Sequence, residues 1–227
     1  PIDKSDRFQK YDEKVSEFLN RDNRMRYTLL KPGTRYWGNK FGRTSWQWDE
    51  VDLKTSKLYD PASGTCYGNQ KWSAERVVPD TQEGYDFPLI RYAEVLLNYA
   101  EAMNEWKGPD ETAEGCPLTA RQVLNMIRDC ADMKHIDANG ADFTAKVRNE
   151  RRIELAFEGH RFYDLRRWKD GDKLKSIIEM KLTKNEDGTI TYKRNVVNRV
   201  WDDKMYLFPI PQSERMKNPN LSQNAGW

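Results

Sequence analysis

Residues 147–169 read VRNERRIELAFEGHRFYDLRRWK, and this stretch decides how the rest of the chain must pack. At 3.6 residues per helical turn, one predicted helical face carries four apolar side chains: Phe143, Val147, Ile153 and Phe157. Glu150 and Glu154 fall within the same apolar arc. A buried carboxylate needs a cationic or hydrogen-bonding partner, and the planar guanidinium of arginine can meet it at two points. The stretch therefore predicts a core helix whose glutamates are held by arginines.

The end of this helix is predicted at Gly159, because glycine adopts the left-handed conformation that a helix end often needs. A second, short amphipathic helix is expected after it, with Phe162, Leu165 and Trp168 on one face. Arg91 is hypothesised to pair with Glu150 or Glu154. The structural ion pairs are expected to use these residues: Arg91, Glu150, Glu154 and Arg161.

Acidic side chains on adjacent turns could instead bind metal ions or hydrolyse glycosidic bonds. A di-iron site needs Glu-x-x-His spacing, whereas His160 follows Glu158 by two positions. The sequence contains no HExxH, GxSxG, phosphate-loop or GxGxxG motif. The other histidine of the chain, His135, lies in a polar stretch and is expected to be solvated. The sequence thus favours structural ion pairs and predicts no enzyme, catalytic residue, metal site or cofactor.

Three blocks in order resemble the RagB/SusD family, the surface glycan-binding lipoproteins of the Bacteroidetes. The signature block comprises Glu150–Arg152, Glu154–Gly159, Arg161 and Asp164–Trp168. The block Phe87–Leu97 with Ala100–Ala102 resembles the helix that opens the family's repeat. The closing block comprises Phe208–Pro211, Asn218–Leu221 and Gln223–Asn224.

The resemblance implies a mainly α fold of tetratricopeptide-like helical hairpins, with long loops and a few short strands. Residues 1–227 would form a single SusD-like C-terminal region with an aromatic-rich loop segment at 34–80, a helical core at 88–170 and a C-terminal strap at 200–227. Full-length relatives carry a lipidated cysteine and a longer helical N-terminal half. The resemblance therefore implies the surface of the outer membrane as location, a lipid anchor outside this chain, and a SusC-like TonB-dependent transporter as partner.

The periodicity predicts further elements outside the signature. Helices are expected over 6–20 and 88–106, the latter ended by Gly108-Pro109, and a third begins at Thr119 with Gln122 completing a capping box. The second of these helices is expected to present Tyr92 and Val95 on its apolar face and Glu101 on the opposite one. Residues 25–30 are predicted to form a short strand, and 180–184 with 189–194 a β-hairpin. Residues 201–227 are expected to be extended, with at most one helical turn after Pro211.

Composition limits the partners. Lys and Arg number 38 and Asp and Glu 36, which leaves a net charge of +2 and no field that would attract nucleic acid or an anionic membrane. Aromatic residues reach 12%, which is typical of a folded chain rather than a disordered one. No apolar run approaches the roughly 20 residues that a membrane span needs. The three cysteines are expected to be free, buried thiols.

Residues 34–80 carry the candidate binding site. They lack helical periodicity yet are rich in aromatic residues, and long irregular segments of this kind are often functional. Indole and phenol rings can stack on the C–H faces of sugars, while planar polar groups meet sugar hydroxyls. The candidate ligand-binding residues are Tyr36, Trp37, Asn39, Trp46, Trp48, Tyr67 and Trp72.

Three other interpretations remain open. The aromatic rings could fill a satellite core beneath a long loop. The chain could be a helical-repeat scaffold whose ligand is a protein, with the aromatic segment as the contact surface. It could also be a hydrolase, for which the segment offers Asp49, Glu50 and Asp52. The favoured function is non-catalytic binding of an oligosaccharide for delivery to the transporter.

Overall fold

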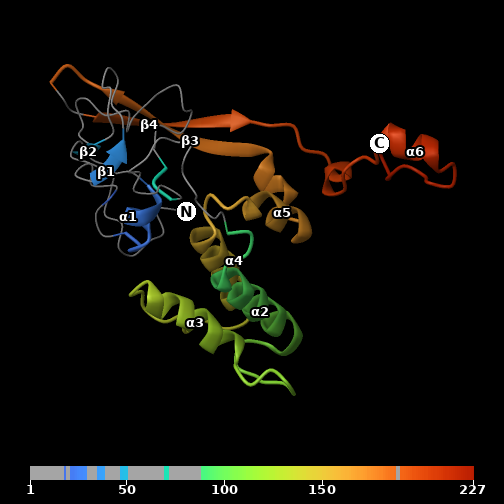
Figure 1. The fold of residues 1–227 in the computed structure, drawn as a ribbon, viewed down its shortest axis with the longest axis horizontal. Coiled ribbons are helices and arrows are strands. Elements are labelled where there is room, and N and C mark those ends of the chain that lie inside the picture. The colour runs from blue at the N-terminus through green and yellow to red at the C-terminus, as the bar shows by residue number, and fades with distance from the viewer. Residues whose placement is uncertain are drawn as a thin grey trace.

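The structure, a computed structural model, describes residues 18, 21–29, 35–38, 47–50, 69–71, 88–187 and 190–227. Its helices and strands follow in this order: α1 (Met25–Thr28), β1 (Arg35–Gly38), β2 (Gln47–Glu50), α2 (Tyr92–Lys107), α3 (Ala120–Cys130), α4 (Gly140–Glu154), α5 (His160–Arg167), η6 (Gly171–Leu174), β3 (Ser176–Lys184), β4 (Ile190–Asn198), η7 (Asp203–Tyr206) and α6 (Gln212–Lys217). The helix expected over 6–20 lies outside the described residues apart from Phe18. The predicted mainly α fold with a few short strands is confirmed (Figure 1).

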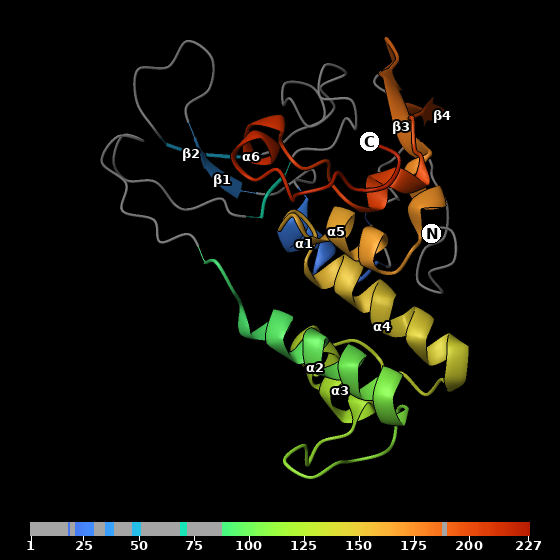
Figure 2. The same cartoon turned by 90° about the vertical axis from the view of Figure 1, so that its right-hand side faces the viewer.

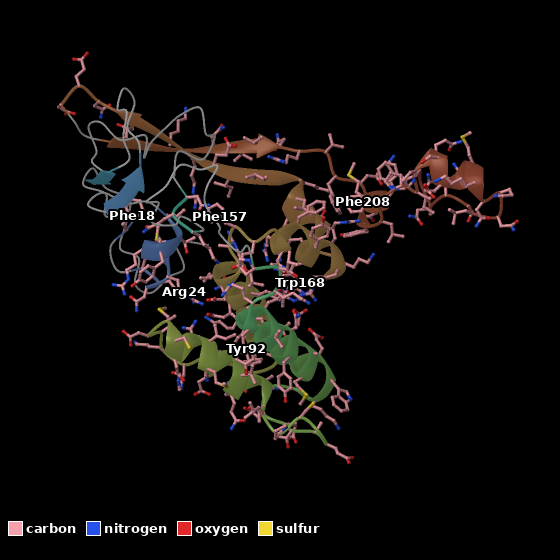
Figure 3. All side chains as sticks on the ribbon, viewed as in Figure 1. Phe18, Arg24, Tyr92, Phe157, Trp168 and Phe208 are labelled. Atoms are coloured by element: carbon pink, nitrogen blue, oxygen red, sulfur yellow. The ribbon has the colours of Figure 1, made fainter. Side chains whose placement is uncertain are left out.

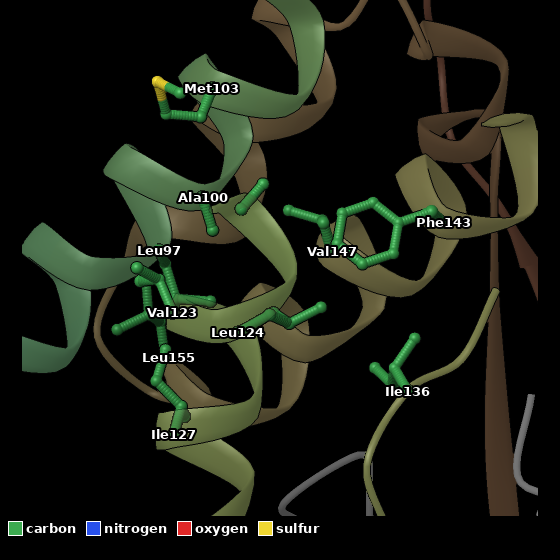
Figure 4. Packing of buried hydrophobic residues seen from close by; sticks show 11 residues of the cluster. Leu97, Ala100, Met103, Val123, Leu124, Ile127, Ile136, Phe143, Val147 and Leu155 are labelled. Carbon is green, nitrogen blue, oxygen red and sulfur yellow. The ribbon is translucent and has the colours of Figure 1, made fainter. Parts of the chain in front are cut away.

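The helices α2, α3 and α4 enclose the hydrophobic core. Figure 4 shows side chains from all three helices meeting around Leu124 and Val147, which are almost completely buried. The other members of this cluster are Leu97, Ala100, Met103, Ala120, Val123, Ile127, Ile136, Phe143 and Leu155. Each fully buried side chain of this size contributes about 1.5–3 kcal/mol relative to its exposed state. This packing fixes α4, which carries the signature glutamates.

The ends of α2 and α3 follow local sequence signals. Gly108 ends α2 with a φ of 93°, a backbone conformation that residues with a side chain rarely adopt. Thr119 caps α3: its side chain accepts a hydrogen bond from the Gln122 amide, and the Gln122 side chain accepts one from the Thr119 amide. The predicted capping box is therefore confirmed, as is the helix stop at Gly108.

The predicted apolar face of α2 is partly wrong. Tyr92 is 71% exposed and Val95 is also exposed, whereas Leu97 and Glu101 are buried. The buried face of α2 is rotated towards Glu101, because that carboxylate binds Arg167 of α5 and the Trp168 indole that follows it. An amphipathic pattern read in isolation assigned this glutamate to solvent.

The predicted end of α4 is also corrected. The helix ends after Glu154, and Leu155 is its C-terminal cap. Gly159, with a φ of 81°, instead precedes the first turn of α5. Phe157 lies between the two helices with a φ of 63° and is 54% exposed, so it does not join the buried face of Phe143 and Val147. The tight connection between α4 and α5 turns Phe157 away from the core.

Residues 25–30 were predicted as a strand, but Met25–Thr28 form a single helical turn, α1. Tertiary contacts override the local pattern here. The Arg24 side chain is bound by acids of α4, and the Thr28 hydroxyl donates to the Arg24 carbonyl oxygen at 2.9 Å. Of residues 25–29, Leu29 forms a strand-like bridge, to Asn69.

The strands β3 and β4 form the predicted antiparallel hairpin, with Ser176 paired to Asn198 and Lys184 to Ile190. In Figures 1 and 2, α4 and α5 lie between this hairpin and the pair α2–α3. The C-terminal segment contacts α5 through Arg166, whose guanidinium donates to the carbonyl oxygens of Met205 and Tyr206. Beyond that point, α6 extends away from α2, α3 and α4 (Figure 1).

The cysteines within the described residues are free, but they are not buried as predicted. Cys116 is half-buried and Cys130 is exposed. Cys130 occupies the last position of α3.

Candidate functional site

The glutamates of α4 face a row of cations from distant parts of the chain. Arg24 joins three acids: its Nη1 lies 2.6 Å from Glu150 and 2.9 Å from Glu154, and its Nη2 lies 2.7 Å from Asp22. Burial lowers the pKa of Arg24, but its hydrogen bond with Asp22 and the charge of Glu150 raise it more, so the net shift is upward. Figure 3 shows Arg24 next to α1 and close to the helices of the core. Arg24 thereby ties α1 to α4.

Glu150 is the most deeply buried of these acids, with 1% of its surface exposed. Arg128 of α3 donates to its Oε2 at 2.6 Å. Its Oε1 meets Arg24 at 2.6 Å as an ionic contact, without the angle of a directed hydrogen bond. Two guanidiniums thus compensate one buried carboxylate and connect α3, α4 and the N-terminal segment.

Arg91, immediately before α2, binds Glu154 at 3.0 Å and Glu158 at 2.7 Å. Of the two partners hypothesised for Arg91, the structure places Glu154 against it and not Glu150. Lys71 completes the cluster with a contact of 2.5 Å to Glu158. Burial raises the pKa of Glu158, but the hydrogen bonds from Arg91 and Lys71 lower it further, so the net pKa lies below its usual range.

A second cluster joins α2, α4 and α5. Arg151 pairs with Asp164 at 2.8 Å, and both side chains are buried. Arg167 donates to Glu101 of α2 at 2.6 Å, and the Trp168 indole donates to the same carboxylate at 2.6 Å. Glu101 was not predicted as a partner, although its position on the same face as Leu97 could have indicated it.

Arg161, expected to take part in the ion pairs, forms none with the described residues. It lies beside the Trp168 ring, with its guanidinium carbon 5.7 Å from the ring centroid. Burial and the nearby charge of Arg152 hold the pKa of the Arg161 guanidinium below its usual value. Asp164 and Asp170 act on Arg161 only at longer range, and the described part of the chain provides no ion pair for it.

The two histidines lie apart, His160 on a helix and His135 in the connection between α3 and α4. His160 begins α5 and is 3.6 Å from Glu94, while His135 lies on the surface beside Asp129 at 2.6 Å. Among the described residues, no group of three or more His, Cys, Asp or Glu side chains could hold a metal ion. Glu150 and Glu154 are each shared between two cations, so α4 is crosslinked to the segments that carry Arg24, Arg91 and Arg128.

The structure brings part of the aromatic segment together through its backbone. The strands β1 and β2 pair in antiparallel fashion, with Trp37 opposite Trp48 and Tyr36 opposite Asp49. This strand pair was not predicted, because residues 34–80 show no helical periodicity and were expected to be irregular. The other candidate ligand-binding residues lie outside the described residues: Asn39, Trp46, Tyr67 and Trp72.

The helices of the described residues include none with the length and apolar character needed to cross a bilayer. The fold and the crosslinked helices define the class: a helix-rich, tetratricopeptide-like protein with short strand pairs attached to the helical core. Within that class, the chain belongs to the SusD family, whose model matches residues 3–227.

Individual relatives agree with this assignment. SusD-like protein P2 of Formosa agariphila is 31% identical over 144 residues, which cover 60% of this chain and 24% of that protein. SusD-like protein P25 of the same organism is 37% identical over 87 residues, or 35% of this chain and 15% of that protein. A crystal structure of a SusD-like protein from Bacteroides fragilis aligns with all of this chain and 42% of its own, at 27% identity and a TM-score of 0.73. The chain thus spans less than half of the length of these relatives.

Proposed function

We propose that this chain is part of a cell-surface protein that binds an oligosaccharide without cleaving it and delivers it to a TonB-dependent transporter of the outer membrane. Membership of the SusD family, whose proteins bind glycans, supports the carbohydrate ligand. The observation that carries the proposal to particular residues is the register of β1 and β2, which pairs the backbone of Trp37 with that of Trp48. The register thus brings the backbones of two tryptophans opposite each other on adjacent strands.

The proposed mechanism is stacking of sugar C–H faces on aromatic rings, aided by hydrogen bonds to sugar hydroxyls. Directly opposite residues of an antiparallel pair have Cβ atoms about 4.5–5.5 Å apart, a spacing suited to one or two sugar rings. Further contacts would come from Tyr36, Asn39, Trp46, Tyr67 and Trp72. Such a site binds with weak to moderate affinity, which suits a protein that passes its ligand on.

Affinity gel electrophoresis against a panel of polysaccharides tests this proposal. The chain should be retarded by at least one polysaccharide, and Trp37→Ala and Trp46→Ala should each reduce the retardation. Trp106→Ala is the matched control, because Trp106 is 65% exposed on α2, outside the aromatic segment. Equal retardation of all three variants and the parent would refute the assigned residues.

A helical scaffold that binds only a protein is the second candidate. The exposed side chains of Tyr92, Val95 and Trp106 on one side of α2 favour it, because apolar side chains grouped on a surface often mark protein contacts. Tryptophan fluorescence separates the two functions. A response to oligosaccharide supports glycan binding, whereas a response to the transporter alone supports the scaffold.

Binding without cleavage is tested separately. An oligosaccharide incubated with the protein should be recovered intact. The rival hydrolase would use an acidic pair of the aromatic segment, where Asp49 and Glu50 lie on β2 and Asp52 lies outside the described residues. Released reducing ends that disappear in an Asp49→Asn variant would establish the hydrolase instead.

A further inference from the structure

A cavity of about 700 Å³ lies between α2, α4, α5 and η6, away from the strand pair β1–β2. Its volume is in the range of pockets that hold small organic ligands. Four cationic side chains line it, against two carboxylates: Arg148, Arg152, Arg161 and Lys173, with Glu105 and Asp170. Figure 3 shows Trp168, which also lines the cavity, where α5 meets α2 and α4.

The carboxylates of the cavity do not balance its cations. Asp170 is engaged by Lys173 at 2.6 Å. Arg148 reaches Glu105 and Asp170 only at 3.9 Å, and its buried Nε has no hydrogen-bond partner in the described part of the chain. A buried donor without a partner costs about 1–3 kcal/mol, and more when it is charged.

Two further guanidiniums lack a close acidic partner among the described residues. Within the described ranges, neither Arg152 nor Arg161 forms an ion pair, and the two lie close enough for Arg152 to lower the pKa of Arg161. Like charges gathered without a counterion are unfavourable, and an anion between them would remove the penalty. The guanidinium geometry suits the planar carboxylate and the oxygens of a sulfate.

The indole of Trp168 holds these cations rather than offering a free stacking surface. The guanidinium carbons of Arg148, Arg161 and Arg167 lie 4.8, 5.7 and 4.8 Å from its ring centroid. Its Nε1 donates to Glu101, which fixes the ring. Recognition in this cavity therefore depends on charge, in contrast to the stacking proposed for the aromatic segment.

We propose that this cavity binds the anionic substituent, a sulfate or a carboxylate, of an acidic saccharide. The proposal rests on the proposed glycan-binding function and adds the ligand's charge to it. Arg148, Arg152 and Arg161 hold the oxyanion, Trp168 orients Arg148 and Arg161, and Asn149 at the cavity wall is available to a sugar hydroxyl.

Isothermal titration calorimetry on the full chain tests the cavity with four probes: a sulfated, a uronate-containing and a neutral oligosaccharide of equal length, and inorganic sulfate. At least one acidic oligosaccharide should bind more tightly than the neutral one, and more weakly as salt is raised. The sulfated and uronate probes show which anion the cavity takes. Inorganic sulfate that binds as tightly as the acidic oligosaccharide would overturn the proposal, because the sugar would then contribute nothing.

Charge-removing variants locate the site. Arg152→Gln and Arg161→Gln should each weaken binding of the acidic oligosaccharide about tenfold, the effect of one lost hydrogen bond to a charged group. Arg199→Gln is the matched control, because Arg199 is exposed at the end of β4, outside the cavity, and its variant should bind like the parent. Unchanged binding in both cavity variants would overturn the proposal.

The outcomes separate this proposal from the one on which it rests. A protein that binds neutral and acidic oligosaccharides equally, and loses both on Trp37→Ala, retains the proposed function and refutes the anion site. A protein that binds no saccharide at all refutes both. Loss of acidic binding in Arg161→Gln, with neutral binding unchanged, supports the anion site specifically.

Discussion

Replacing Glu150 with glutamine tests whether the ion pairs between the glutamates of α4 and their arginine partners stabilise the fold. The substitution Glu150→Gln keeps the side-chain shape but removes the charge that faces Arg24 and Arg128, each 2.6 Å away. Only 1% of Glu150 is exposed, so the lost charge lies at a buried site. Removing one partner of a buried ion pair costs about 3–5 kcal/mol. We expect about 3 kcal/mol for Glu150→Gln, since the amide oxygen can still accept one hydrogen bond.

Thermal and urea unfolding, followed by circular dichroism, measure this cost. For a chain of 150–250 residues, each kcal/mol lowers Tm by about 2–4 °C, so Tm should fall by about 6–12 °C. Glu214→Gln is the matched control, because Glu214 pairs with Lys217 on the exposed surface of α6 and should change stability by less than about 1 kcal/mol. If both variants unfold at the same temperature, the assignment of Glu150 as the anchor of α4 is incorrect.

Two further predictions concern the packing of α5 and η6. Burial raises the pKa of Glu101, but hydrogen bonds from Arg167 and Trp168 lower it further, to below its usual 4.5. The stabilisation that Glu101 provides is therefore complete above about pH 4.5 and is lost as the pH falls through the lower pKa of the folded state. In urea titrations between pH 5 and 3, the stability of Glu101→Gln should fall less steeply with pH than that of the parent. An equally steep fall in both proteins would contradict this. A Cβ added to Gly171 would clash with the Trp201 indole. Gly171→Ala should therefore destabilise the protein by about 1–3 kcal/mol and shift its tryptophan emission. An unchanged emission spectrum and Tm would argue against this contact.

Short sequence signals correctly predicted where several helices and strands begin or end. The Thr119–Gln122 capping box, the stop at Gly108 and the turn between β3 and β4 depend on residues that are neighbours in the chain. Such contacts form whatever the rest of the protein does. Predictions that relied on helical periodicity alone were less accurate: Tyr92 was expected on the apolar face of its helix but is exposed.

The sequence located the candidate binding residues less completely than it located the ends of helices. The sequence drew attention to the aromatic segment, but only the structure pairs Trp37 with Trp48, because strand register depends on backbone hydrogen bonds between residues 11 positions apart. The cavity around Arg148 and Trp168 had no sequence signature at all. It combines residues of α2, α4, α5 and η6, which meet only after folding.

By itself, the sequence determined the family, through the three motif blocks that resemble RagB/SusD proteins, and that resemblance implied the mainly α architecture. The sequence also determined that buried glutamates need arginine partners, because burying an unpaired charge is costly. The tertiary structure alone decided which cation meets which acid. Arg24 reaches Glu150 across 126 positions of sequence, and Arg167 reaches Glu101 across 66. Spacing along one helix defines its faces, but the rotation of each face towards its neighbours depends on how all of the helices pack together.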